Sequence, residues 1–99
     1  MINNEQIIQI IFNVIDTFNE NQKNENRLKK SKETVLFGHG TVLDSLGLVD
    51  ILIGIEQEIE DEYGINITIA DERAMSQEQS PFKTIGTLID YIELLEPQL

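Results

Sequence analysis

Apolar residues recur at helical spacing in three stretches of the chain, which predict helices over residues of about 4–19, 45–62 and 84–95. Asn3 or Asn4 is a suitable N-cap for the first helix, and Thr84 is one for the last. Gly64 suits the left-handed residue that closes the second helix. The expected core therefore comes from the apolar stripes of these three helices.

The second of these helices has an apolar arc that is wider than one stripe. Such a helix either lies centrally in the fold or exposes apolar residues beside its acids to a partner. Gly47 and Gly54 fall inside it, at a cost of roughly 1 kcal/mol each relative to Ala. We therefore expect a close backbone approach at both glycines.

The connections between the helices are less regular. Residues 23–32 hold five of the seven basic residues among many polar ones and predict a long solvated loop, and residues 35–37 predict a short apolar anchor onto the core. Residues 65–69 alternate apolar and polar, but no second strand pattern exists to pair with them, so we expect an extended connection. A short helix is expected over about 70–75.

Together these elements predict an all-α fold, a four-helix bundle of three longer helices and one short helix with a long first loop. A chain of 99 residues is expected to form a single domain over 1–99. Its apolar fraction of 40% is sufficient for a modest core and argues against general disorder.

The charged residues are distributed unevenly along the chain. The chain has 18 acidic and seven basic residues, and residues 44–99 carry 13 of the acids but only two of the bases. A net charge of −11 excludes nucleic acid as a partner class. The apolar runs are too short for membrane insertion and the start lacks a secretory pattern, so we expect a cytoplasmic monomer. The absence of Cys excludes thiol catalysis, disulfides and thiolate metal sites.

The most informative segment spans residues 43–62, which hold seven acids and no basic residue and include Asp44, Ser45 and Leu46 directly after Leu43. A serine at the start of a helix lies near unsatisfied backbone N–H groups and the positive end of the helix dipole, which favour a phosphate attached to its hydroxyl. Simple helix capping is the alternative interpretation of these residues. The acid run presents either a negative face to a basic partner or a merely solvated face.

An Asp-Ser-Leu sequence that opens an apolar and acidic helix, after a long loop from a first helix, resembles the acyl carrier protein family. It also resembles the related peptidyl and D-alanyl carrier proteins. The resemblance covers nearly the whole chain, and residues 43–62 are its specific part. It implies that a separate phosphopantetheinyl transferase attaches 4′-phosphopantetheine, taken from coenzyme A, to Ser45, with Asp44 assisting the transferase.

The resemblance further implies a carrier that is not itself an enzyme and that holds acyl or aminoacyl groups as thioesters for separate loading and transferring enzymes. These enzymes would bring basic patches to a recognition helix, and a groove between the helices would shelter part of the cargo. The residues implied for partner binding are Leu46, Val49, Asp50, Ile53 and Glu56.

Two departures from the family pattern favour a specialised, stand-alone carrier. Val42 stands where fatty-acid carriers usually have glycine, which brings the motif closer to D-alanyl or peptidyl carriers, and residues 71–82 form a longer segment than usual. The resemblance implies an acyl cargo for fatty-acid-like, polyketide-like or cell-envelope lipid synthesis, or alternatively a D-alanyl or peptidyl cargo. An acidic helical adaptor without a prosthetic group is the alternative from another functional class.

Other chemistry finds little support in the sequence. His39 is the single histidine, and the carboxylates at 58 and 60–62 do not have the spacing of a calcium loop, so we expect no metal site. A Gly-x-Ser-x-Gly elbow is missing around Ser45, which makes this residue an acceptor of a group and not a catalytic nucleophile.

Overall fold

The computed structural model describes residues 2–37, 41, 43–70 and 82–95, with backbone only at residues 25 and 45. Within these residues it contains the α-helices α1 (Asn4–Glu20), α2 (Ser45–Tyr63) and α4 (Ile85–Leu95), one 3-10 turn, η1 (Asn24–Asn26), and no strand. The all-helical class is as predicted, and the helix bounds agree with the predicted ones to within a residue. The expected short helix over 70–75 lies outside the described residues except for Ala70, which is not helical, so the four-helix arrangement is not shown.

Helix α1 starts at a reciprocal cap. The Asn3 side chain accepts a hydrogen bond from the Gln6 N–H at 2.8 Å, and the Gln6 side chain accepts one from the Asn3 N–H at 2.9 Å. Two of the N–H groups that a helix start leaves without helical partners are thereby satisfied. The helix then buries one face, formed by Ile7, Ile10, Ile11, Val14 and Ile15.

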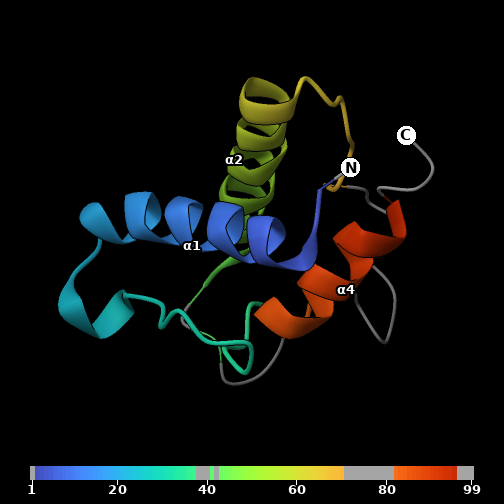
Figure 1. The fold of residues 1–99 in the computed structure, drawn as a ribbon. Helices are drawn as coiled ribbons and strands as arrows, with labels where there is room; N and C mark the ends of the chain where they lie inside the picture. The colour runs from blue at the N-terminus through green and yellow to red at the C-terminus, as the bar shows by residue number, and fades with distance from the viewer. Residues whose placement is uncertain (1, 38–40, 42, 71–81, 96–99) are drawn as a thin grey trace.

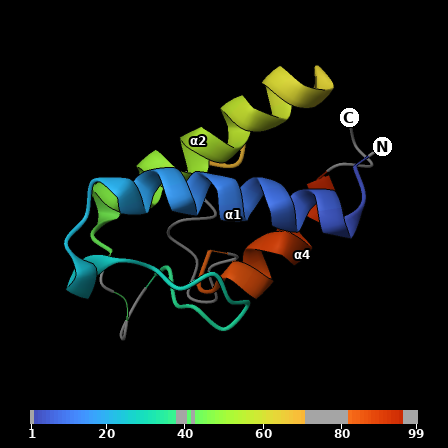
Figure 2. The same ribbon diagram turned by 60° about the vertical axis from the view of Figure 1, so that its left-hand side comes forward.

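Helix α2 crosses α1, and α4 lies beside the N-terminal half of α1 (Figures 1 and 2). Gly54 marks the crossing, because a Cβ atom at this position would lie 3.0 Å from the Val14 Cγ1 atom. At Gly64 the chain takes φ +66°, and its N–H donates to the Glu60 carbonyl at 2.9 Å. The predicted close approach at Gly54 and the predicted left-handed closure at Gly64 are both confirmed.

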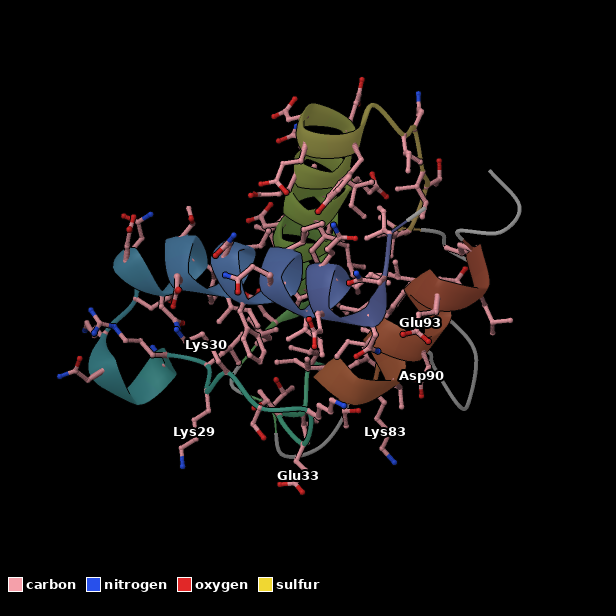
Figure 3. All side chains as sticks on the ribbon, viewed as in Figure 1. Lys29, Lys30, Glu33, Lys83, Asp90 and Glu93 are labelled. Carbon is pink, nitrogen blue, oxygen red and sulfur yellow. The ribbon has the colours of Figure 1, made fainter. Side chains whose placement is uncertain are left out.

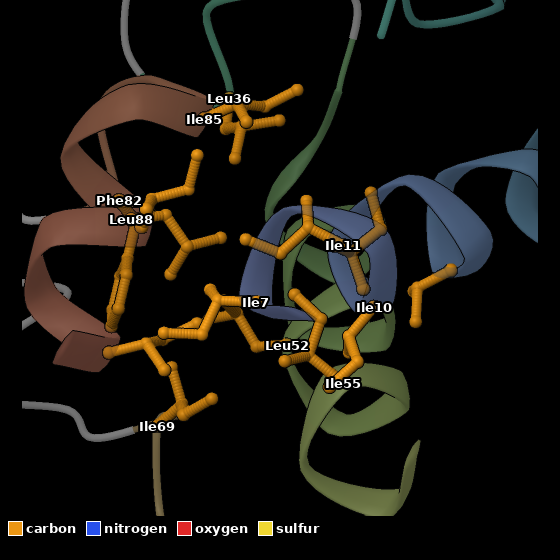
Figure 4. Packing of buried hydrophobic residues seen from close by; sticks show 14 of the residues in the cluster. Ile7, Ile10, Ile11, Leu36, Leu52, Ile55, Ile69, Phe82, Ile85 and Leu88 are labelled. Carbon is orange, nitrogen blue, oxygen red and sulfur yellow. The ribbon is translucent and has the colours of Figure 1, made fainter. Parts of the chain in front are cut away.

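The core lies where the three helices meet (Figure 4). Ile7 and Ile11 of α1 and Leu52 and Ile55 of α2 are packed into one cluster with Phe82 and the apolar face of α4. The segment after α2 joins this cluster through buried Ile67 and Ile69, and no strand pairs with it in the described part of the chain. The alternation over residues 65–69 thus marks an extended connection that buries one side, as predicted.

The basic loop is less solvated than the sequence predicts. Leu28 lies in its middle and is only 6% exposed. The Asn19 side chain accepts from the Leu28 N–H and donates to the Leu28 carbonyl, each at 2.9 Å. The basic loop therefore reaches the core at Leu28, because the Asn19 side chain of α1 forms hydrogen bonds with both backbone groups of this buried residue. The ion pair between Lys30 and Asp16, at 3.1 Å, is exposed and adds little.

Residues 32–36 close the start of α4. The carbonyls of Thr34 and Lys32 accept hydrogen bonds from the N–H groups of Ile85 and Gly86, at 3.1 and 2.8 Å. The next N–H, that of Thr87, donates to the hydroxyl of Thr84 at 3.1 Å, which makes Thr84 the N-cap as predicted. Two first-turn donors of α4 are thus satisfied by a loop that is distant in the sequence, and the third is satisfied by the N-cap.

The apolar anchor predicted at residues 35–37 is part of the same closure. Val35 forms an isolated antiparallel bridge with Thr84, and the Leu36 N–H donates to the Lys83 carbonyl at 2.7 Å. The Leu36 side chain is fully buried in the core. These contacts confirm that the long connection is attached to the core at this point.

A larger side chain at the helix crossing is expected to destabilise the fold. Gly54→Leu forces atoms into the space that Val14 occupies, and overpacking of this kind costs about 1–3 kcal/mol. Urea denaturation of Gly54→Leu, Val14→Ala and the double variant measures this effect. The double variant should lose less than the sum of the single losses. Strictly additive losses would show that the two positions do not meet.

Removal of the Asn19 side chain is expected to release the basic loop. Asn19→Ala leaves the buried backbone of Leu28 without two partners, and we expect a loss of about 1–3 kcal/mol in the free energy of unfolding. Urea denaturation measures the loss, and Asn66→Ala at an exposed position is the matched control. An equal effect of the two substitutions would contradict the role given to Asn19.

Candidate functional site

The start of α2 presents the Asp-Ser-Leu sequence on a well-defined cap. Asp44 has extended backbone, its carboxylate accepts from the Gly47 N–H at 2.7 Å, and its carbonyl accepts from the Leu48 N–H at 3.1 Å. Ser45 is consequently the first residue of the helix, and Asp44 is the N-cap. The backbone of Ser45 therefore lies at the positive end of the helix dipole.

Gly47 lies close to this cap. A Cβ atom at Gly47 would lie 3.1 Å from the Leu43 Cδ2 atom and 3.2 Å from the Asp44 Oδ1 atom. A side chain at this position would require both neighbours to shift by a few tenths of an ångström. The close approach predicted for Gly47 is confirmed. This glycine follows the Asp-Ser-Leu sequence and lies close to the side chains of Leu43 and Asp44.

Most of the predicted partner-binding residues are accessible on α2. Leu46 is 71% exposed, Ile53 is 41% exposed, Asp50 is exposed and Val49 is half-buried. Residues three, four and seven positions apart lie on one side of a helix, so these four side chains share a face. The wide apolar arc of α2 therefore has both predicted consequences, since the helix contributes to the core and also exposes apolar side chains beside acids.

Glu56 has a different place from the other four. Its half-buried carboxylate accepts hydrogen bonds from the N–H groups of Ile69 and Ala70, at 2.6 and 2.8 Å. It thus attaches the extended segment after α2 to the helix. The sequence contained an indirect signal for this contact, because a buried extended segment without a partner strand needs acceptors for its N–H groups.

An open hollow lies beside the start of α2. It has a volume of about 310 Å³ and is lined by Asp44, Leu46 and Gly47 on one side and by Phe18, Gln22 and Asn26 on the other. A second hollow of about 530 Å³ continues from it between α1 and α2 and reaches Gly54 and Asp61. Phe18, Gln22 and Asp50 line both hollows. A group attached near the start of α2 thus has space between the two helices.

The charges on α2 have no basic neighbours within residues 43–62. Figure 3 shows the side chains of Lys29 and Lys83 pointing away from α2, while Lys30 is paired with Asp16 on α1. The carboxylates of α2 therefore form a negative surface, whose electrostatic range is set by the salt concentration.

The described part of the chain lacks the side-chain groups and helices that two other kinds of site require. No group of three or more His, Asp or Glu side chains there is arranged to bind a metal ion. Nor does any helix among those residues combine the length and the apolar character that crossing a membrane requires. His39, which the sequence singled out as the single histidine, lies outside the described residues.

The contact of Glu56 leads to a prediction. Glu56→Ala should lower the free energy of unfolding by about 2 kcal/mol, because hydrogen bonds to a charged group are stronger than neutral ones. Hydrogen exchange at the amides of residues 69 and 70 should accelerate in the same variant. Glu60→Ala, at an exposed position of the same helix, is the control. Unchanged exchange at these two amides would show that the carboxylate is free to serve a partner instead.

Comparisons of this chain with protein-family models, with curated proteins and with solved structures give no match. The functional assignment therefore depends on the residues and the geometry described above.

Proposed function

We propose that this protein is a carrier that bears 4′-phosphopantetheine on Ser45 and holds acyl or aminoacyl groups as thioesters for separate enzymes. The observation that carries the proposal is the position of Ser45 as the first residue of α2, directly after the Asp44 cap and between two residues that line an open hollow. The Asp-Ser-Leu sequence at this point is the part of the chain that resembles carrier proteins.

The start of α2 fits a phosphate ester. The helix dipole favours a negative group next to residue 45, and the Asp44 carboxylate is engaged by the Gly47 N–H at 2.7 Å. In the attachment step the Ser45 hydroxyl oxygen forms a bond to the phosphorus of the phosphopantetheine half of coenzyme A. The bond from that phosphorus to 3′,5′-ADP breaks, and the hydroxyl proton passes to a base of the transferase.

When bound, the prosthetic group supplies a terminal thiol that forms thioesters. The chain's own residues have other roles: Asp44 fixes the start of the helix, and Leu46, Val49, Asp50 and Ile53 form the face that partner enzymes meet. A small apolar patch among carboxylates suits short-lived, salt-sensitive docking by several enzymes in turn. Glu56 contributes indirectly, by fixing the segment that follows α2.

The test is intact mass after incubation of the purified chain with coenzyme A and a broad-specificity phosphopantetheinyl transferase. We expect the wild-type chain to gain one phosphopantetheinyl group and Ser45→Ala to gain none. Ser31→Ala is the matched control and should gain the group. Because Asp44 and not Ser45 is the N-cap, Ser45→Ala should retain the helical circular dichroism of the wild type.

Failure of the wild-type chain to gain the group, in a sample that circular dichroism shows to be folded, would contradict the proposal. The exposed apolar and acidic face of α2 would then favour the other candidate, an adaptor that binds a basic protein surface without a covalent group. An adaptor retains its partner in the Ser45→Ala variant, whereas a carrier loses all of its function.

A further inference from the structure

We propose that the hollow between α1 and α2, here called the α1–α2 groove, holds the neutral part of the pantetheine arm along this side of the protein. The groove is lined by residues of the C-terminal half of α1 and of the middle of α2, and Val14, Phe18, Gln22, Asp50, Gly54 and Gln57 are among them. This inference rests on the proposed attachment of the arm to Ser45.

The two hollows adjoin each other. The smaller hollow includes Asp44 and Leu46, the two neighbours of residue 45, and it shares Phe18, Gln22 and Asp50 with the α1–α2 groove. The distance along the helix axis from Asp44 to Gly54 is about 15 Å at 1.5 Å per residue. The groove thus extends along α2 from the neighbourhood of residue 45 to the helix crossing.

The lining of the groove combines apolar and amide side chains. Val14 meets Gly54 at the crossing point, and Ile51 also lines the groove. The amide side chains are those of Gln22 and Gln57. Amide side chains both donate and accept hydrogen bonds, which is what the two amide groups of a pantetheine arm require. The dimethyl carbon of the arm in turn suits the apolar side chains.

Charge separates the two ends of the arm. Asp50, Glu58 and Asp61 line the α1–α2 groove, and no Lys or Arg is among its lining residues in the described part of the chain. Asp44 and Asp50 line the smaller hollow as well, but only there does the positive end of the helix dipole favour a phosphate, so we expect the phosphate to remain at the start of α2. The neutral amide part experiences no such repulsion. The groove therefore matches this part of the arm and not its anionic end.

Another hollow in the structure does not meet these conditions. It has a volume of about 310 Å³ near the start of α4, and Asn4, Lys32 and Asp90 line it. It shares no lining residue with the hollow beside residue 45. An arm attached to Ser45 has no continuous path to it.

Isotope-filtered NMR on the loaded protein tests the inference. A chain labelled with carbon-13 and nitrogen-15 is loaded with an unlabelled arm from coenzyme A, and intact mass first establishes the loading. We expect nuclear Overhauser effects from the methyl groups of the arm to the Phe18 ring and to methyl groups of Val14 and Ile51. The side-chain amide signals of Gln22 and Gln57 should shift on loading, whereas that of Gln9 should not.

A matched pair of variants locates the arm. Thr17 and Gln9 are both exposed on α1, but of the two only Thr17 lines the α1–α2 groove. Thr17→Trp should fill the groove and abolish these Overhauser effects without preventing loading, and Gln9→Trp should leave them in place. The inference would be overturned if the Overhauser effects persisted unchanged in Thr17→Trp, or if the loaded wild-type chain showed none. In either case the carrier function would stand. Failure of the loading itself would overturn both.

Discussion

The close crossing of α1 and α2 is the constraint on which the rest of the structure depends. Because Gly54 has no side chain, Val14 of α1 approaches the backbone of α2 and brings the two apolar faces into one core. Helix α4 completes that core from the other side. The same crossing sets the depth of the groove between the helices and the position of the first turn of α2 relative to Phe18.

Helix α2 combines two kinds of surface because its apolar residues outnumber those that one buried stripe requires. Its buried side faces α1 and the core, while Leu46 and Ile53 remain accessible beside carboxylates. Exposed apolar side chains are retained at a cost in solubility, which the net negative charge of the chain offsets.

The elements that could be predicted from the sequence are those with a local signal. Apolar periodicity located the helices, and short-range chemistry identified the caps at Thr84 and Gly64 and narrowed the first cap to Asn3 or Asn4, of which the structure uses Asn3. Hydrogen bonds between one side chain and a backbone segment that is distant in the sequence could not be predicted, because they leave no periodic pattern of residue types. Asn19 holds Leu28 in this way, and the basic loop was therefore predicted to be more solvated than it is.

The candidate site likewise has features that could be predicted from the sequence and features that could not. The motif and the cap at residues 44 and 45 could be predicted because a helix start has a characteristic composition. The hydrogen bonds of Glu56 with the N–H groups of residues 69 and 70 depend on the path of the chain after α2. The spacing of Glu56 along the helix does not encode this path, and by spacing alone Glu56 was grouped with the accessible residues. The hollows likewise result from the packing angle of two helices, which no single segment encodes.

The closure of α4 by residues 32–36 has a consequence for cooperativity. Val35 and Thr84 are separated by 49 positions in the sequence, from 35 to 84, and joining them closes a large loop at a considerable entropic cost. The N–H groups of Ile85 and Gly86 obtain their acceptors only after this closure, and residues 32–36 gain their contacts with the start of α4 only when α4 is in place. The two distant segments therefore form one cooperative unit, so that local opening of the N-terminal end of α4 also releases the loop.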